Sequence, residues 1–129
     1  KSLNNYIDVF LPEKELKKQV MGIVTDSTPL EAPKNPDGDT VFALYSLLAP
    51  PADVQAMREK YLAGGYGYGH AKQALFGLMV ETFAAERARF AHLMANPNEL
   101  EAELRAGEEK ARAVASKTIQ RVRDVLGFS

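Results

Sequence analysis

The sequence predicts an all-α protein, an antiparallel bundle of about five helices with a short extended N-terminal lead-in. Apolar residues recur at the three- and four-residue spacing of helices through most of the chain, as at Leu16 and Val20. Proline or glycine interrupts this pattern at Pro50, Gly64 and Pro97. Helices joined by such short connections are typical of a bundle.

The first half of the chain is expected to hold three helices and one long loop. The aromatic and β-branched run 6–11 indicates a brief strand or an extended lead-in. A helix should follow from about residue 12 to 24, with Pro12 in its first turn. The loop 25–40 is rich in proline, and a loop of this length is as readily a plain connector as a functional segment. Helices over 41–48 and 51–62 complete this half.

The second half is expected to consist of two longer helices. The strongest helical pattern runs from His70 to about Asn96, with an expected core stripe of Phe76, Val80, Phe83, Phe90 and Met94. Pro97 ends this helix and begins the last one, in which apolar residues continue as far as Leu126.

Between these halves, the segment Gly64–Gly69 interleaves four glycines with two tyrosines. It lacks the Gly-Lys-Ser/Thr ending of a phosphate-binding loop and follows no predicted strand. A hinge between two helices, with its tyrosines packed on the bundle, is the favoured interpretation. Tyr66, Tyr68 and the 6–11 segment are the apolar groups most expected to be exposed.

The composition is that of a small soluble domain. The chain has 129 residues, of which 46% are hydrophobic and 26% charged, with a formal net charge of −1. It has no cysteine, which excludes disulfides and thiolate metal sites, and no apolar stretch long enough to span a bilayer. The near-neutral charge argues against a uniformly basic nucleic-acid-binding surface.

Groups that suggest catalysis are scarce. His70 and His92 lie 22 positions apart on what should be one helix, so they cannot share a metal ion. No nucleophile motif such as Gly-x-Ser-x-Gly occurs. We therefore expect no metal site and do not expect the chain to be a complete enzyme.

Charge is unevenly distributed at the C-terminal end. Residues 96–109 carry five Glu against one Arg, and residues 110–129 carry five basic residues against one Asp. On a helical wheel, Lys110, Lys117 and Arg121 fall within one narrow sector, from which they could reach phosphates. The helix dipole favours the same order of charges without any ligand, so a purely structural role stays open.

Several segments together resemble the C-terminal portion of the bacterial-type tryptophanyl-tRNA synthetases, which are class I aminoacyl-tRNA synthetases. The segments that carry the resemblance are Lys1-Ser2 with the following Asn pair, Val24–Ser27, Gly65–Gly69, and Gly107–Ala111 leading to Leu126–Phe128. The match covers essentially the whole chain, and the order and spacing of the segments make it specific.

The resemblance implies roles for the first residues. Lys1 and Ser2 would be the last two residues of the family's Lys-Met-Ser-Lys-Ser loop, which closes on the phosphates of ATP bound with Mg²⁺. Lys1 would stabilise charge on the departing pyrophosphate, and Ser2 would assist by hydrogen bonding. Residues 1–11 would then be the remnant of this loop and its lead-in, and residues 12–129 the helical anticodon-binding domain.

The resemblance also implies a function and partners. The intact enzyme uses ATP to attach tryptophan to its tRNA, acts in the cytoplasm and forms a homodimer. Its N-terminal catalytic domain has no counterpart here, so this chain alone should be inactive and monomeric, binding the tRNA for tryptophan through Lys110, Lys117 and Arg121. The alternatives are a helical protein-interaction module without a nucleic-acid role and, with less support, a helix-turn-helix DNA-binding protein.

Overall fold

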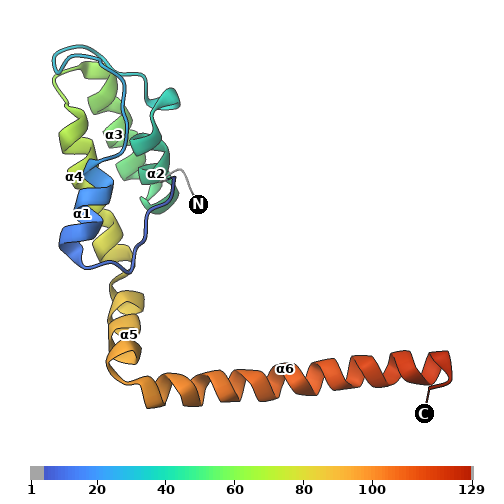
Figure 1. The fold of residues 1–129 in the computed structure, drawn as a ribbon. Helices are drawn as coiled ribbons and strands as arrows, with labels where there is room; N and C mark the ends of the chain where they lie inside the picture. Colours follow the sequence, from blue (N-terminus) through green and yellow to red (C-terminus); the bar gives the residue numbers. More distant parts are fainter. Residues whose placement is uncertain (1–4, 129) are drawn as a thin grey trace. The chain divides into compact units, whose positions relative to one another are not determined.

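The computed structural model describes residues 5–128, and all regular secondary structure in this range is helical, with no β-strand (Figure 1). The six α-helices are α1 (Glu13–Met21), α2 (Thr40–Leu48), α3 (Pro51–Ala63), α4 (Tyr68–Thr82), α5 (Ala84–Ala95) and α6 (Pro97–Leu126), with a short 3-10 helix at Pro36–Gly38. The predicted all-α class is confirmed. The prediction of about five helices is one short because the segment expected to form one helix from His70 to Asn96 forms two.

The chain divides into two compact units, residues 1–87 and residues 88–129. In the first unit, α4 packs against α1 and α2, and α2 also packs against α3 (Figure 1). The second unit consists of the end of α5 and the whole of α6. Within residues 5–128, no helix is long and apolar enough to cross a membrane.

The hydrophobic core lies in the first unit, where each of the four helices contributes residues one turn apart or adjacent. The buried apolar residues are Leu16 and Val20 of α1, Val41 and Phe42 of α2, Met57 and Tyr61 of α3, and Ala71, Leu75 and Met79 of α4. Residues four apart lie on the same face of a helix, so the helical spacing in the sequence is the direct cause of this core.

The predicted core stripe of the long helix was wrong. The chain leaves helical geometry at Phe83, where φ is −100° and ψ is 18°, and α5 starts afresh at Ala84. Phe76 and Val80 only flank the core, while Phe90 and Met94 are 41% and 60% exposed. The break shifts the helical phase, so one continuous stripe cannot face one core.

The N-terminal lead-in forms no strand within the part that the structure describes. Residues 5–8 form no regular secondary structure, and the backbone amide of Asp8 donates a 2.9 Å hydrogen bond to Oε1 of Gln19 on α1. Ile7 packs against the core, whereas Tyr6 is 58% exposed. Arg87 also ties this segment down by donating a hydrogen bond to the backbone carbonyl of residue 9. The lead-in is thus held by side chains instead of by a sheet.

The long loop before α2 is ordered by two buried polar residues. Asp39 caps α2, since its Oδ1 accepts hydrogen bonds from the amide of Phe42 at 2.7 Å and from the hydroxyl of Tyr61 at 2.9 Å. Lys34, which is only 2% exposed, donates from Nζ to the carbonyls of residues 29, 30 and 32 at 3.0–3.2 Å. Because these carbonyls take the place of water around the ammonium, the lysine can be buried.

Candidate nucleic-acid interface

The three predicted RNA contacts lie together on α6. Lys110, Lys117 and Arg121 are all exposed, and on a helix of 3.6 residues per turn they fall within about 40° of one another. None of them forms an ion pair with another described residue. We call these three residues the basic ridge. Its cations are therefore free to contact phosphates.

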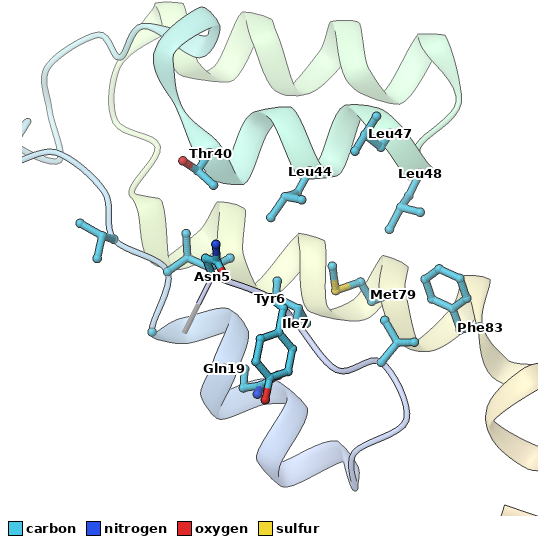
Figure 2. A pocket seen from close by; sticks show the side chains of 14 residues that line it. Asn5, Tyr6, Ile7, Gln19, Thr40, Leu44, Leu47, Leu48, Met79 and Phe83 are labelled. Carbon is cyan, nitrogen blue, oxygen red and sulfur yellow. The ribbon is translucent and has the colours of Figure 1, made fainter. Parts of the chain in front are cut away.

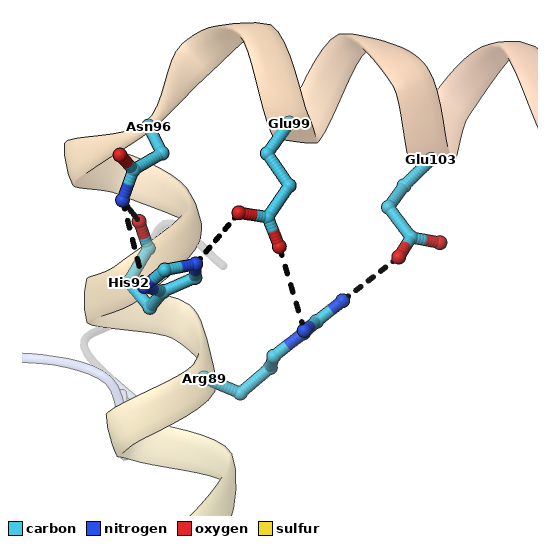
Figure 3. A network of polar contacts seen from close by, with 5 residues as sticks. All are labelled: Arg89, His92, Asn96, Glu99 and Glu103. Carbon is cyan, nitrogen blue, oxygen red and sulfur yellow. Dashed lines mark hydrogen bonds and ion pairs between the residues drawn. The ribbon is translucent and has the colours of Figure 1, made fainter.

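The acidic start of α6 is neutralised by basic side chains of α5, as Figure 3 shows. Arg89 binds Glu99 at 3.6 Å and Glu103 at 2.9 Å, and Nε2 of His92 lies 2.7 Å from the second oxygen of Glu99. All four side chains are 40–58% exposed, so each ion pair contributes little to stability. These contacts pair the glutamates of α6 that lie closest to α5. The basic ridge, which lies further along α6, has no such partners.

The remaining charges of α6 differ in their pairing. Arg105 pairs with Glu101 and Arg112 with Glu108, each one helical turn away. The C-terminal half of the helix therefore keeps an excess of positive charge, in agreement with the sequence. Because residues 101–126 are all exposed, these charges are accessible to a partner.

The glycine-rich hinge brings together a group that the sequence analysis did not single out. The ring centroids of Tyr66 and His70 are 5.7 Å apart with an interplanar angle of 30°, and Nζ of Lys60 lies 5.6 Å from the centroid of the Tyr66 ring. His70 and Gly69 are exposed, and no atom would lie within 4 Å of a Cβ added at Gly69. We call Lys60, Tyr66 and His70 the hinge cluster. An aromatic pair beside a lysine is a surface on which a flat base can stack.

The interpretation of the hinge as a connection whose tyrosines pack on the bundle is confirmed, because Tyr66 and Tyr68 are partly buried against the core. The expectation that they are among the most exposed apolar groups was wrong. Tyr68 donates a 2.8 Å hydrogen bond to Oδ1 of Asp26, and burial, followed by this bond, raises the pKa of Tyr68 to about 12. In the sequence, the only indication of the hinge cluster is that Lys60 and His70 lie on either side of the glycine-rich segment. It was missed because neither residue belongs to a recognised motif.

A cavity of about 660 Å³ opens in the first unit between the lead-in, α1, α2 and α4 (Figure 2). Its polar side chains are those of Asn5, Tyr6, Gln19 and Thr40, and no acid, histidine, lysine or arginine of the described chain lines it. The cavity is suited to hold an apolar group. Its walls are mainly apolar, formed by residues such as Ile7, Leu44, Leu48, Met79 and Phe83.

The resemblance assigns ATP binding to the first residues of the chain. Lys1 and Ser2 lie outside the described residues. Within residues 5–128, no group of three or more histidine, aspartate or glutamate side chains is placed to hold a metal ion.

Comparison with known proteins relates the chain to one group of enzymes, although no family model matches it. It is 41% identical over 128 residues to the tryptophan–tRNA ligase of Fusobacterium nucleatum and 43% identical over 128 residues to that of Rhodopirellula baltica. In both cases 99% of this chain is aligned, but only 39% and 40% of the relative.

A solved structure agrees with these relatives. The crystal structure of tryptophanyl-tRNA synthetase from Campylobacter jejuni, complexed with ADP and tryptophan, matches 98% of this chain with a TM-score of 0.85 and 37% identity. The match covers 40% of that chain and falls in its C-terminal part. The resemblance inferred from the sequence is thus confirmed: this chain is homologous to the tryptophan–tRNA ligases over about 40% of their length.

Proposed function

We propose that this chain is the tRNA-binding part of a tryptophan–tRNA ligase and that residues 12–129 contact the anticodon end of the tRNA for tryptophan. The main support is the alignment of 99% of the chain with tryptophan–tRNA ligases. The complete enzyme would use ATP to attach tryptophan to that tRNA. Lys1 and Ser2 would serve only that complete form, and the chain by itself would be inactive.

Within this function, the basic ridge and the hinge cluster have different tasks. Ammonium and guanidinium groups bind the RNA backbone without regard to sequence, and Lys110, Lys117 and Arg121 are exposed and unpaired for that purpose. Anticodon bases are unpaired, and such bases are recognised by stacking and by contacts to their edges. His70, exposed and tilted against the Tyr66 ring, is suited to receive one of them.

We expect Lys117→Glu and Arg121→Glu each to weaken binding of the tRNA for tryptophan. A ridge that neutralises three phosphates should make the logarithm of the affinity fall with the logarithm of salt concentration with a slope of about −2 to −3, and each substitution should reduce that slope by about 1. Fluorescence anisotropy with labelled tRNA at two salt concentrations measures both quantities.

Arg112→Glu is the matched control for the ridge, because it makes the same charge change on the opposite margin of α6, where Arg112 is already paired with Glu108. It should leave the slope nearly unchanged. If all three variants bind alike, or if the unmodified chain shows no affinity at low salt, the ridge does not contact RNA.

His70→Ala is expected to weaken binding by about 1–3 kcal/mol, the usual contribution of one stacked base, and to leave the salt slope unchanged. The exposed His92, which lies 22 residues away, provides the control as His92→Ala. Anisotropy titration of an anticodon stem–loop at fixed salt measures the difference. Equal losses for the two alanine variants would exclude base stacking on His70.

A protein-interaction module remains the second candidate function, and the apolar cavity of the first unit favours it. A module of this kind would bind its partner without RNA. It would therefore retain its binding after Lys117→Glu and lose it after a polar substitution in the cavity wall, such as Leu44→Gln.

A further inference from the structure

Four lysines lie together on the first unit, where α1 packs against α4 (Figure 1). Lys14, Lys17 and Lys18 belong to α1, and Lys72 belongs to α4. We call these four residues the lysine patch. They are half of the eight lysine and arginine residues between residues 5 and 87, so the nearly neutral charge of the chain conceals a local basic surface.

Two contacts between the helices place Lys72 beside the lysines of α1. Nζ of Lys17 lies 5.8 Å from the centroid of the Phe76 ring, and Nζ of Lys72 donates a 3.2 Å hydrogen bond to the backbone carbonyl of Met21. Residue 17 thus meets residue 76 and residue 21 meets residue 72, so α1 and α4 run in opposite directions. Lys72 and Phe76 are one turn apart and therefore share the side of α4 that borders α1.

On α1, the three lysines share one side of the helix. At about 100° per residue, Lys14, Lys17 and Lys18 fall within a sector of about 100°. The buried Leu16 and Val20 lie outside this sector, on the side that faces the core. All three lysines are exposed. Their ammonium groups are therefore accessible to a partner.

No acid of the described chain neutralises the lysine patch, since none of its members forms an ion pair with another described residue. The two glutamates of α1, Glu13 and Glu15, lie on either margin of the lysine sector. Other cations of the first unit do have partners, as Arg58 has in Asp37 at 2.6 Å and Lys34 has in three carbonyls. The patch is thus the main unneutralised positive charge among the described residues of this unit.

The stability of α1 does not explain where its lysines lie. A helix favours cations in its last turn, which holds Lys18, and disfavours them in its first turn, which holds Lys14. Lys14 and Lys18 are also like charges four residues apart, an arrangement that destabilises a helix. An anion bound between these two side chains would replace their repulsion by attraction.

From these observations we propose that the lysine patch binds phosphates of the tRNA backbone, as a second electrostatic contact beside that of the basic ridge. The proposal rests on the proposed function, because the tRNA supplies the anion. Phosphates are negative charges repeated along a strand, and a group of ammonium ions binds them without regard to sequence. The patch belongs to the first unit and the ridge to the second, so each contact belongs to a different part of the chain.

Two of the four side chains are held in place before any RNA binds. Lys17 lies over the Phe76 ring, and Lys72 is bonded to the Met21 carbonyl, so both lose less conformational freedom on binding. An ammonium group has three N–H donors, and Lys72 uses one of them for this carbonyl. The other donors of Lys72 remain for a phosphate.

A second contact predicts a steeper dependence on salt than the basic ridge would give alone. Each neutralised phosphate contributes about 0.7–0.9 to the slope, so seven phosphates give about −5 to −6. Lys14→Glu and Lys18→Glu should each reduce the magnitude of the slope by about 1. Combining Lys14→Glu with Lys117→Glu should reduce it by about 2, because the two contacts are independent. Fluorescence anisotropy with labelled tRNA over a salt series measures all of these slopes.

Lys14→Glu also separates binding from folding. A glutamate in the first turn of α1 suits the helix dipole and removes the repulsion with Lys18, so the unfolding temperature should stay the same or rise while the affinity for tRNA falls. Lys14→Arg keeps the charge and should bind tRNA as the unmodified chain does. Arg112→Glu makes the same charge change in the second unit, at a side chain already paired with Glu108, and it controls for net charge.

The outcomes distinguish this proposal from the proposed function. If Lys14→Glu and Lys18→Glu keep the slope of the unmodified chain while Lys117→Glu reduces it, the lysine patch does not contact RNA and the proposed function stands. An unmodified chain without affinity for tRNA at low salt would overturn both. Labelled polyglutamate tests another kind of anion. If it binds as tightly as tRNA and Lys14→Glu weakens both equally, the patch recognises carboxylates and its assignment to RNA is wrong.

Discussion

Tyr61→Ala is expected to lower the free energy of unfolding of the first unit by about 3–5 kcal/mol, the usual cost of removing a large aromatic side chain from a core. Tyr61 is fully buried and is the largest such side chain in the core. Its ring contacts those of Phe42, Tyr66 and Tyr68, with centroids 5.5–6.1 Å apart. Its removal would leave a cavity where α2, α3 and the hinge meet.

The hydroxyl of Tyr61 makes a separate contribution. It donates to Asp39, and burial together with this bond raises the pKa of Tyr61 far above its usual value, so the hydroxyl remains protonated. Tyr61→Phe keeps the ring and should cost only about 1.5–3 kcal/mol, the range for a hydrogen bond to a charged group. The difference between the two variants separates ring packing from the hydroxyl.

Urea unfolding followed by tyrosine fluorescence measures both variants in the first unit alone. All five tyrosines of the chain lie at or before residue 68, and the chain has no tryptophan. Four tyrosines therefore remain as reporters after either substitution. If Tyr61→Ala costs no more than Tyr61→Phe, the aromatic contacts do not support the core.

The sequence predicted a helix correctly where the apolar spacing and the proline or glycine that ends the helix agree. Leu16, Val20, Met57 and Tyr61 follow helical spacing within helices that proline or glycine ends, and all four are buried as their spacing requires. The prediction of one long helix from His70 to Asn96 was wrong because the helical spacing of its apolar residues continues across a point where the backbone helix is interrupted. The backbone leaves helical geometry at Phe83, and neither proline nor glycine marks this break in the sequence.

One part of the candidate site could be predicted from the sequence and another could not. The basic ridge was predictable since three residues on one helical face share an orientation whatever surrounds them. The hinge cluster was not, because Lys60 and His70 approach the Tyr66 ring only through the turn that the two preceding glycines make. Similarly, nothing in the sequence distinguishes Lys34 from a surface lysine. Only the folded loop places three carbonyls around its ammonium group.

Gly64→Ala is expected to be the second most damaging substitution, and it tests how the hinge is held. Gly64 has φ of 76° and ψ of 173°, a conformation that is essentially restricted to glycine and costs other residues about 1–3 kcal/mol. A Cβ at this position would also lie 2.4 Å from the backbone oxygen of Glu31. The loss should therefore exceed the conformational cost alone.

The neighbouring glycine provides a matched control. Gly65 has φ of 75°, but an added Cβ there would have no atom within 4 Å. Gly65→Ala should thus incur conformational strain alone, so the difference in unfolding free energy between the two variants measures the close approach of the loop to the hinge. Equal decreases in unfolding free energy for the two variants would show that the loop can move away from the added methyl group without loss of stability.

The structural consequence of Gly64→Ala should be local. The loop is joined to the end of α3 and the hinge by two backbone hydrogen bonds, from the amide of Lys34 to the carbonyl of Tyr61 at 2.7 Å and from the amide of Gly65 to the carbonyl of Leu30 at 3.0 Å. A loop displaced by the new methyl group would weaken both bonds. Hydrogen exchange at these two amides should then quicken, whereas exchange within α1 should change only as far as global stability does. Because the hinge cluster follows these glycines directly, a loosened hinge should also reduce base stacking there without altering the salt slope set by the basic ridge.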